Sequence, residues 1–142
     1  MSTAYAQQMA KYNREAVLSA PPARLLTMLY DRLLLDLGRA EVAQQEQNWA
    51  AASENLVHAQ AIIAELSASL NTEAWDGADQ LVALYTFASN TMIEANIRRD
   101  AAKTRDCITV LEPLRQSWHE AAASLPVQMA AAPSSGGNLG IG

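Results

Sequence analysis

Apolar side chains recur along most of the chain at spacings of three and four residues, which is the period of an amphipathic helix. The pattern predicts four helices that are separated by short polar or proline-containing segments. Their approximate ranges are 22–46, 48–70, 78–99 and 101–122. Pro22 suits the first turn of the first helix, where its missing N–H is not needed, and Asn48 is a good N-cap for the second helix.

Each predicted helix has one stripe of apolar residues suited to a core. In the second helix the spacings alternate between four and three residues, which is the rhythm of a four-helix bundle. The stripe residues are Leu26, Leu29, Leu33, Leu37 and Ala40 in the first helix, with Tyr30 at the edge, Ala52, Leu56, Ala59, Ile63, Leu66 and Leu70 in the second, Leu81, Leu84, Tyr85, Ala88, Met92 and Ala95 in the third, and Cys107, Val110 or Leu111, Leu114, Trp118 and Ala121 in the fourth. The expected fold is all-α, an antiparallel up-down-up-down four-helix bundle over residues 21–123.

The segments on either side of the bundle differ from it in composition. Residues 1–20 are polar with a few spaced apolar side chains, and we expect them to form a mobile N-terminal arm. Residues 124–142 are small and rich in Gly, Pro and Ser, so we expect a disordered tail. Inside the fourth helix Pro113 removes a backbone hydrogen bond. Because the apolar rhythm continues across it, a kink near residues 109–113 is expected rather than a break.

Three helices have apolar residues outside their predicted core stripes. Those of the first helix are seven residues apart and lie nearly opposite its stripe, among charged side chains. The residues are Met28, Leu35 and Val42 in the first helix, Val57 and Ile62 in the second, and Val82, Ile93 and Ile97 in the third. Rows at helical spacing are typical of a partner surface. A bundle that buries wide stripes, or a homodimer, would explain the same pattern.

Composition limits the classes of function. The 142 residues are half apolar, carry a net charge of −5 and include one cysteine, so no internal disulfide can form and a reducing compartment is expected. Phosphate binding needs clustered cations, but the densest basic cluster, at residues 98–105, is interrupted by aspartate, so we expect no nucleic-acid partner. There is no apolar run of about 18 residues and no secretory signal. We therefore expect no membrane insertion and a cytoplasmic location.

Candidate catalytic residues are few. A bundle can hold two metal ions on inward Glu residues and Glu-x-x-His pairs, but the nearest match, Glu54 with His58, has the wrong spacing and faces away from the core stripe. Cys107 lies on a core stripe, which favours an inert buried thiol over a nucleophile. No Gly-rich phosphate loop, nucleophile elbow or zinc motif is present. We expect no enzyme activity, no cofactor and no bound metal; a metal-dependent bundle enzyme is the alternative that metal analysis tests.

Several local strings together resemble the FliS family of flagellar secretion chaperones. They are LLTMLYD at 25–31, HAQAIIAEL at 58–66, ALY at 83–85, IEANIRRD at 93–100, and Trp118, in the family's order and spacing. The resemblance covers about residues 5–120. It implies a cytoplasmic helical bundle that binds the disordered C-terminal segment of flagellin on its outer surface. It also implies that the bundle prevents premature polymerisation and delivers flagellin to the flagellar type III export gate.

The resemblance also gives roles to individual residues. The client forms helices around the outside of the bundle, so the apolar residues outside the core stripes of the first and third helices, together with Ile62 of the second, become candidate contacts. Tyr12, ten residues before Pro22, matches a tyrosine of the family's arm, which covers part of that surface until the client displaces it. Asn96 and Asp100 either hydrogen-bond the client backbone or cap the turn after the third helix, and the sequence leaves both open. We expect a monomer or weak homodimer when free; the alternative function is a structural homodimer or adaptor without a flagellin client.

Overall fold

The structure is a computed structural model that describes residues 22–70 and 77–124. Within these residues all regular structure is helical, in the order α2 (Pro22–Gln45), α3 (Trp49–Ala68), α4 (Ala78–Ile97) and α5 (Ala101–Ala123). The helix ends agree with the predicted ends to within two residues. The expected arm with Tyr12, nearly all of the expected tail and the segment 71–76 lie outside the described residues. No helix of the described part is long and apolar enough to cross a membrane.

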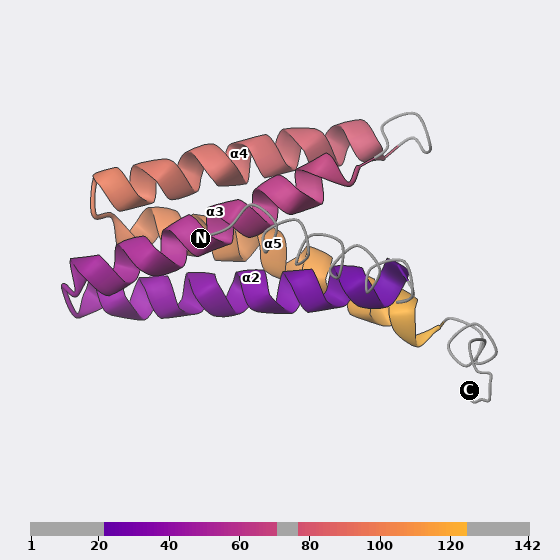
Figure 1. Ribbon diagram of the computed structural model, residues 1–142, viewed down its shortest axis with the longest axis horizontal. Helices are drawn as coiled ribbons and strands as arrows, with labels where there is room; N and C mark the ends of the chain where they lie inside the picture. Colours follow the sequence, from indigo (N-terminus) through magenta and orange to yellow (C-terminus); the bar gives the residue numbers. More distant parts are fainter. Residues whose placement is uncertain (1–21, 71–76, 125–142) are drawn as a thin grey trace, which may run out of the picture. The chain divides into compact units, whose positions relative to one another are not determined.

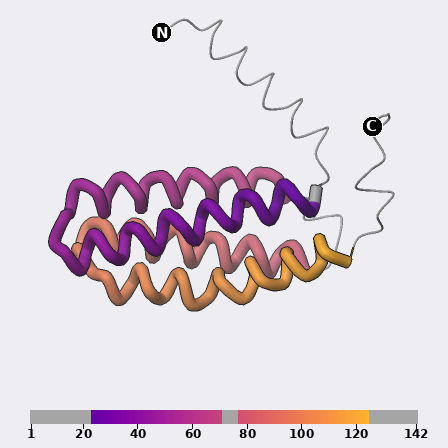
Figure 2. The backbone as a smooth tube through the Cα atoms, turned by 90° about the horizontal axis from the view of Figure 1, so that it is seen from below, coloured from indigo at the N-terminus to yellow at the C-terminus, as the bar shows by residue number. Residues whose placement is uncertain are grey.

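The chain divides into two compact units. The main unit is residues 29–115, and the terminal unit combines residues 1–28 with residues 116–142. The main unit contains the larger part of every helix, and each helix in it runs antiparallel to the next one along the chain (Figure 1 and Figure 2). The predicted all-α four-helix bundle is confirmed.

The core of the main unit is formed by the predicted stripes. Its largest fully buried apolar side chains are Tyr30, Leu33, Leu37, Leu56, Leu66, Tyr85, Met92 and Leu111. Each such leucine contributes roughly 1.5–3 kcal/mol by leaving water. Several stripe residues are less covered: Leu26, Leu29, Leu70, Leu84, Leu114 and Trp118 are half-buried, and Ala121 is exposed. They lie in the parts of the helices that are farthest along the chain from the two tight turns.

Two tight turns close one end of the main unit. The turn after α2 has Gln47 at φ 60° and the turn after α4 has Arg99 at φ 54°, both in the left-handed region. The following N–H groups, of Asn48 and Asp100, donate to carbonyl oxygens five residues back at 2.7 and 3.0 Å, which satisfies helix carbonyls in the manner of a Schellman motif. A residue with a side chain costs about 1 kcal/mol in this conformation. At Arg99 a cation–π contact offsets part of this cost, since the guanidinium lies 5.1 Å from the centre of the Trp49 ring.

Two local predictions concern single residues at helix positions. Asn48 caps α3 as expected, because its side-chain oxygen accepts a hydrogen bond from the N–H of Ala51 at 3.2 Å. Pro113 lies inside α5, which continues through it. The expected absence of a break is therefore confirmed, and the kink stays a prediction.

Candidate functional site

The outward side of α2 presents large apolar side chains that are about half exposed. In the main unit Leu35 is 44% exposed and Val42 is 51% exposed, and in the terminal unit Met28 is also exposed. Leu33 and Leu37, two residues on either side of Leu35, are fully buried. The outward residues are therefore not the margin of a wide buried stripe, which was one explanation of the sequence pattern.

A hollow of about 460 Å³ follows this side of α2 within the main unit. Its walls are formed by Leu34, Leu35, Gly38, Arg39, Val42 and Ala43 of α2, by Glu46 and Asn48 of the turn, and by Ala51 of α3. A Cβ atom placed on Gly38 would meet no atom within 4 Å. The missing side chain at Gly38 thus keeps the hollow open between Leu35 and Val42.

A buried carboxylate lies next to this outward surface. Asp36 is fully buried, its Oδ1 accepts a hydrogen bond from Nε of Arg32 at 2.9 Å, and its Oδ2 is hydrogen-bonded to Nδ1 of His58 on α3. An unpaired carboxylate would cost several kcal/mol at such a site. His58 is half-exposed and lies two helical turns along α3 from Ala51, a residue of the hollow. The Asp36 cluster therefore joins α2 to α3 close to the α2 hollow.

α3 and α4 also expose apolar side chains. Val82, Ile93 and Ile97 of α4 are exposed, Ile97 at 76%, and so is Val57 of α3. Ile62 is different, because it is only 6% exposed and belongs to the core. The expectation that Ile62 lies outside the core stripe was wrong. It follows His58 by one turn, and His58 contacts Asp36 of α2, so this flank of α3 faces α2.

One exposed apolar residue was missed by the sequence analysis. Phe87 of α4 is 47% exposed. It lies about 140° around the helix from Val82, so it does not share a line with the other exposed apolar residues of α4. No periodic pattern predicted that Phe87 is exposed. Only its large apolar side chain and its position away from the core stripe could have indicated it.

Asn96 and Asp100 have partners inside the bundle. Nδ2 of Asn96 donates to the hydroxyl oxygen of Ser53 at 3.1 Å and so joins α4 to α3. Oδ1 of Asp100 accepts from the N–H of Ala102 at 3.0 Å, at the start of α5. The capping alternative is thus observed for Asp100, while Asn96 makes a contact that neither alternative anticipated. Contacts of these two residues with a partner stay a prediction.

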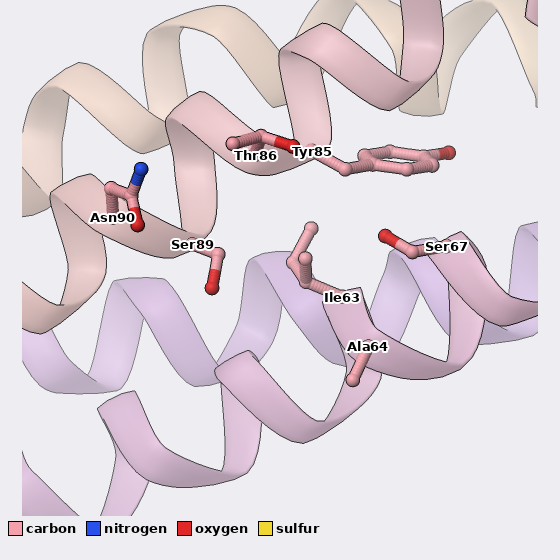
Figure 3. A pocket seen from close by; sticks show the side chains of 7 residues that line it. All are labelled: Ile63, Ala64, Ser67, Tyr85, Thr86, Ser89 and Asn90. Carbon is pink, nitrogen blue, oxygen red and sulfur yellow. The ribbon is translucent and has the colours of Figure 1, made fainter.

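A second, smaller hollow of about 220 Å³ lies between α3 and α4. Figure 3 shows Ile63 pointing from α3 toward α4, with Ser67 on one side of it and Ser89 on the other. Hydroxyl and amide groups form much of its wall, and the Thr86 hydroxyl donates to the carbonyl of Val82 at 2.9 Å. This polar lining suits an apolar partner less well than the lining of the α2 hollow does.

Polar and reactive groups of the interior are held by neighbours. The side chain of Gln44 donates to the carbonyl of Ala95 at 3.1 Å and accepts from the Thr104 hydroxyl at 2.6 Å, which links α2, α4 and α5. Burial raises the pKa of the Cys107 thiol to about 12, with a smaller contribution from the charge of Asp106. Cys107 is therefore the inert thiol that was expected. In the described residues no group of three His, Cys, Asp or Glu side chains is placed to hold a metal ion.

Comparison with known proteins gives one consistent answer. The family model described as "Flagellar protein FliS" matches residues 5–125. The flagellar secretion chaperone FliS of Escherichia coli (strain K12) is 32% identical over 111 residues, which cover 77% of this chain and 82% of the relative. The FliS of Bacillus subtilis (strain 168) is 29% identical over 113 residues, or 80% and 84% of the two chains. That of Salmonella typhimurium (strain LT2) is 31% identical over 119 residues, or 82% and 86%.

A solved structure has the same fold. A bacterial flagellar chaperone determined by crystallography superposes with a TM-score of 0.68, covering 84% of this chain and 98% of the other. Its sequence identity is 19%, so this match supports the arrangement of the helices and nothing finer.

Proposed function

Because this chain belongs to the FliS family of flagellar secretion chaperones, we propose that it binds the disordered C-terminal segment of flagellin on the outward surface of its bundle. Members of this family are chaperones, and the chain is not an enzyme. The proposed contacts are the exposed residues Met28, Leu35 and Val42 of α2 and Val82, Ile93 and Ile97 of α4. The proposed location is the cytoplasm, where flagellin is made.

The observation that carries this proposal is the open apolar surface of α2. A disordered segment that folds on binding loses about 2–5 kcal/mol or more in ordering. It recovers this only by burying a long apolar surface, and a helix in a groove is one common way to do so. Leu35, Val42 and the Gly38 opening supply such a surface in the free chain without any rearrangement of the core.

Binding at this surface would serve two steps of flagellum assembly. A covered C-terminal segment cannot pair with other flagellin molecules, so premature polymerisation is prevented. The complex is then delivered to the flagellar type III export gate. The N-terminal arm, residues 1–20 with Tyr12, would cover part of the surface until flagellin displaces it, and deletion of residues 1–15 would then change the affinity for flagellin.

Charge substitution on α2 tests the proposal. We expect Val42→Asp to weaken binding of the purified flagellin C-terminal segment at least tenfold in calorimetry, because it places a carboxylate against apolar surface. The matched control is Val57→Asp, since Val57 of α3 is equally exposed at 55% but lies outside the α2 hollow. Both variants should keep the helicity and melting temperature of the parent.

Two outcomes would contradict the proposal. If Val42→Asp unfolds the bundle, Val42 supports the fold rather than a partner. If Val42→Asp binds flagellin as the parent does, the α2 hollow is not the contact surface. Sedimentation adds an independent check, because a free monomer that forms a one-to-one complex with flagellin supports the chaperone function over a structural homodimer.

A further inference from the structure

The charges on α2 are unlike those of the molecule as a whole. The chain has a net charge of −5, yet three of the four acidic residues that α2 and its end contribute to the main unit are in ion pairs. The pairs are Asp31 with Arg115 at 2.9 Å, Asp36 with Arg32 at 2.9 Å, and Glu41 with Arg105 at 2.6 Å. The negative charge of α2 is therefore largely compensated.

The arginines next to the hollow are less compensated. Arg39 lines the hollow, is exposed and has no ion-pair partner in the described part of the chain. Arg32 is half-exposed and reaches Asp36 through Nε, and among the described residues its two terminal nitrogens make no hydrogen bond. An unpaired guanidinium beside an apolar hollow is suited to a carboxylate that arrives with apolar neighbours.

We infer that the α2 hollow selects a segment that is both apolar and acidic, with an apolar side chain over Gly38 and a carboxylate on the guanidinium of Arg39. This inference rests on the proposed function and specifies the chemistry of the flagellin segment that occupies the hollow. Gly38 and Arg39 are adjacent, so a single turn of a bound helix can supply both contacts. Arg32 offers a second donor two turns away, about 10 Å along the helix.

Glu46 gives the bound segment a direction. It lines the same hollow two turns beyond Arg39, and within the described residues it has no ion-pair partner. A carboxylate placed opposite Glu46 would be repelled, whereas one placed opposite Arg39 or Arg32 is attracted. The acidic residues of the bound segment therefore lie toward the Arg32 side, and apolar or basic residues lie toward the turn at residues 46–48.

The test measures how charge at Arg39 affects flagellin binding. With the purified C-terminal segment of the same bacterium's flagellin as the probe, we expect Arg39→Glu to weaken binding roughly tenfold at low salt, because attraction becomes repulsion. The difference should shrink at about 0.5 M salt, where exposed charges are screened. The matched control is Arg98→Glu, since Arg98 is also exposed, has no ion-pair partner among the described residues and does not line the hollow.

Charge exchange identifies the partner residue. Substitution of the acidic residues of the flagellin segment by lysine, one at a time, should reveal a position at which the lysine variant restores binding to Arg39→Glu. If Arg39→Glu binds within twofold of the parent while Val42→Asp does not bind, the hollow takes a purely apolar segment and the inference fails with the proposed function intact. If neither substitution changes binding, the proposed surface itself is wrong.

Discussion

Leu35 and Asp36 are neighbours on α2, and their burial is the reverse of what their polarity suggests. Leu35 is 44% exposed, whereas Asp36 is fully buried. Asp36 is tolerated inside because Arg32 and His58 satisfy its two oxygens. Leu35 lies on the opposite side of the helix axis from the core, next to the hollow. The inner face of α2 is thus determined by contacts within the chain, and the outer face is not.

This difference separates stability from binding. The inner face has Leu33, Leu37 and Ala40 without any exposed area, so most of the contribution of α2 to folding comes from there. Substitution of the outer residues should change the free energy of unfolding little, because their side chains already contact water. Substitutions on the two faces should therefore be distinguishable in a denaturation experiment.

The largest effect is expected from truncating leucines on the two faces of α2. Leu33→Ala should lower the free energy of unfolding by about 2–5 kcal/mol, since it removes buried methyl groups and leaves a cavity. Leu35→Ala, the matched variant two residues away, should change it by less than about 0.5 kcal/mol. Urea denaturation followed by circular dichroism measures both. A loss above about 2 kcal/mol for Leu35→Ala would mean that the outer face supports the fold.

The second effect concerns proton binding in the core. Cys107 has a pKa of about 12 in the folded chain but about 8.5–9 when unfolded. Above pH 9 the unfolded chain therefore binds fewer protons than the folded chain, and stability falls as pH rises. Between pH 9 and 10 the parent should lose about 1 kcal/mol more than the Cys107→Ala variant. Equal slopes for the two proteins would show that the thiol is not held in its protonated form by burial.

The smallest effect compares a buried and an exposed carboxylate on α2. In a double-mutant cycle, Asp36→Asn with His58→Gln should give a coupling of about 0.5–1 kcal/mol. Because Asp36 is buried, the coupling should persist in 1 M salt. The same cycle for Asp31 and Arg115, which are both partly exposed, should give a smaller coupling that salt removes. A coupling for the Asp36 pair that disappears in salt would contradict its burial.

Helical periodicity was sufficient to predict the fold and the outward residues of α2. The rotation per residue in a helix is fixed, so Met28, Leu35 and Val42 must lie on one side once Leu33 and Leu37 define the core. The first residues of α2 and α3 were predicted from the local chemistry of Pro22 and Asn48, which does not depend on the rest of the fold.

Helical periodicity did not predict the burial or the contacts of side chains that meet a neighbouring helix. Ile62 was expected outside the core because it lies at the side of the α3 stripe, but that flank of α3 faces α2 and Ile62 is buried. Asp36 gave no signal in the sequence, since its partner His58 is 22 residues away and on another helix. The contact of Asn96 with Ser53 was missed for the same reason. Sequence patterns give the direction of a side chain around its own helix, and the packing of helices decides what it meets.

The open position at Gly38 has a consequence for how such a chaperone can change over generations. Alanine can occupy position 38 without disturbing the interior, because an added Cβ would meet no other part of the chain within 4 Å. Alanine there would stabilise α2 by about 0.5–1 kcal/mol. Glycine therefore lowers the stability of the helix and leaves the space beside it empty. Under the proposed function, Gly38→Ala would fill part of the space offered to flagellin and leave the interior unchanged, so the fit to a changed client could be adjusted at this one position.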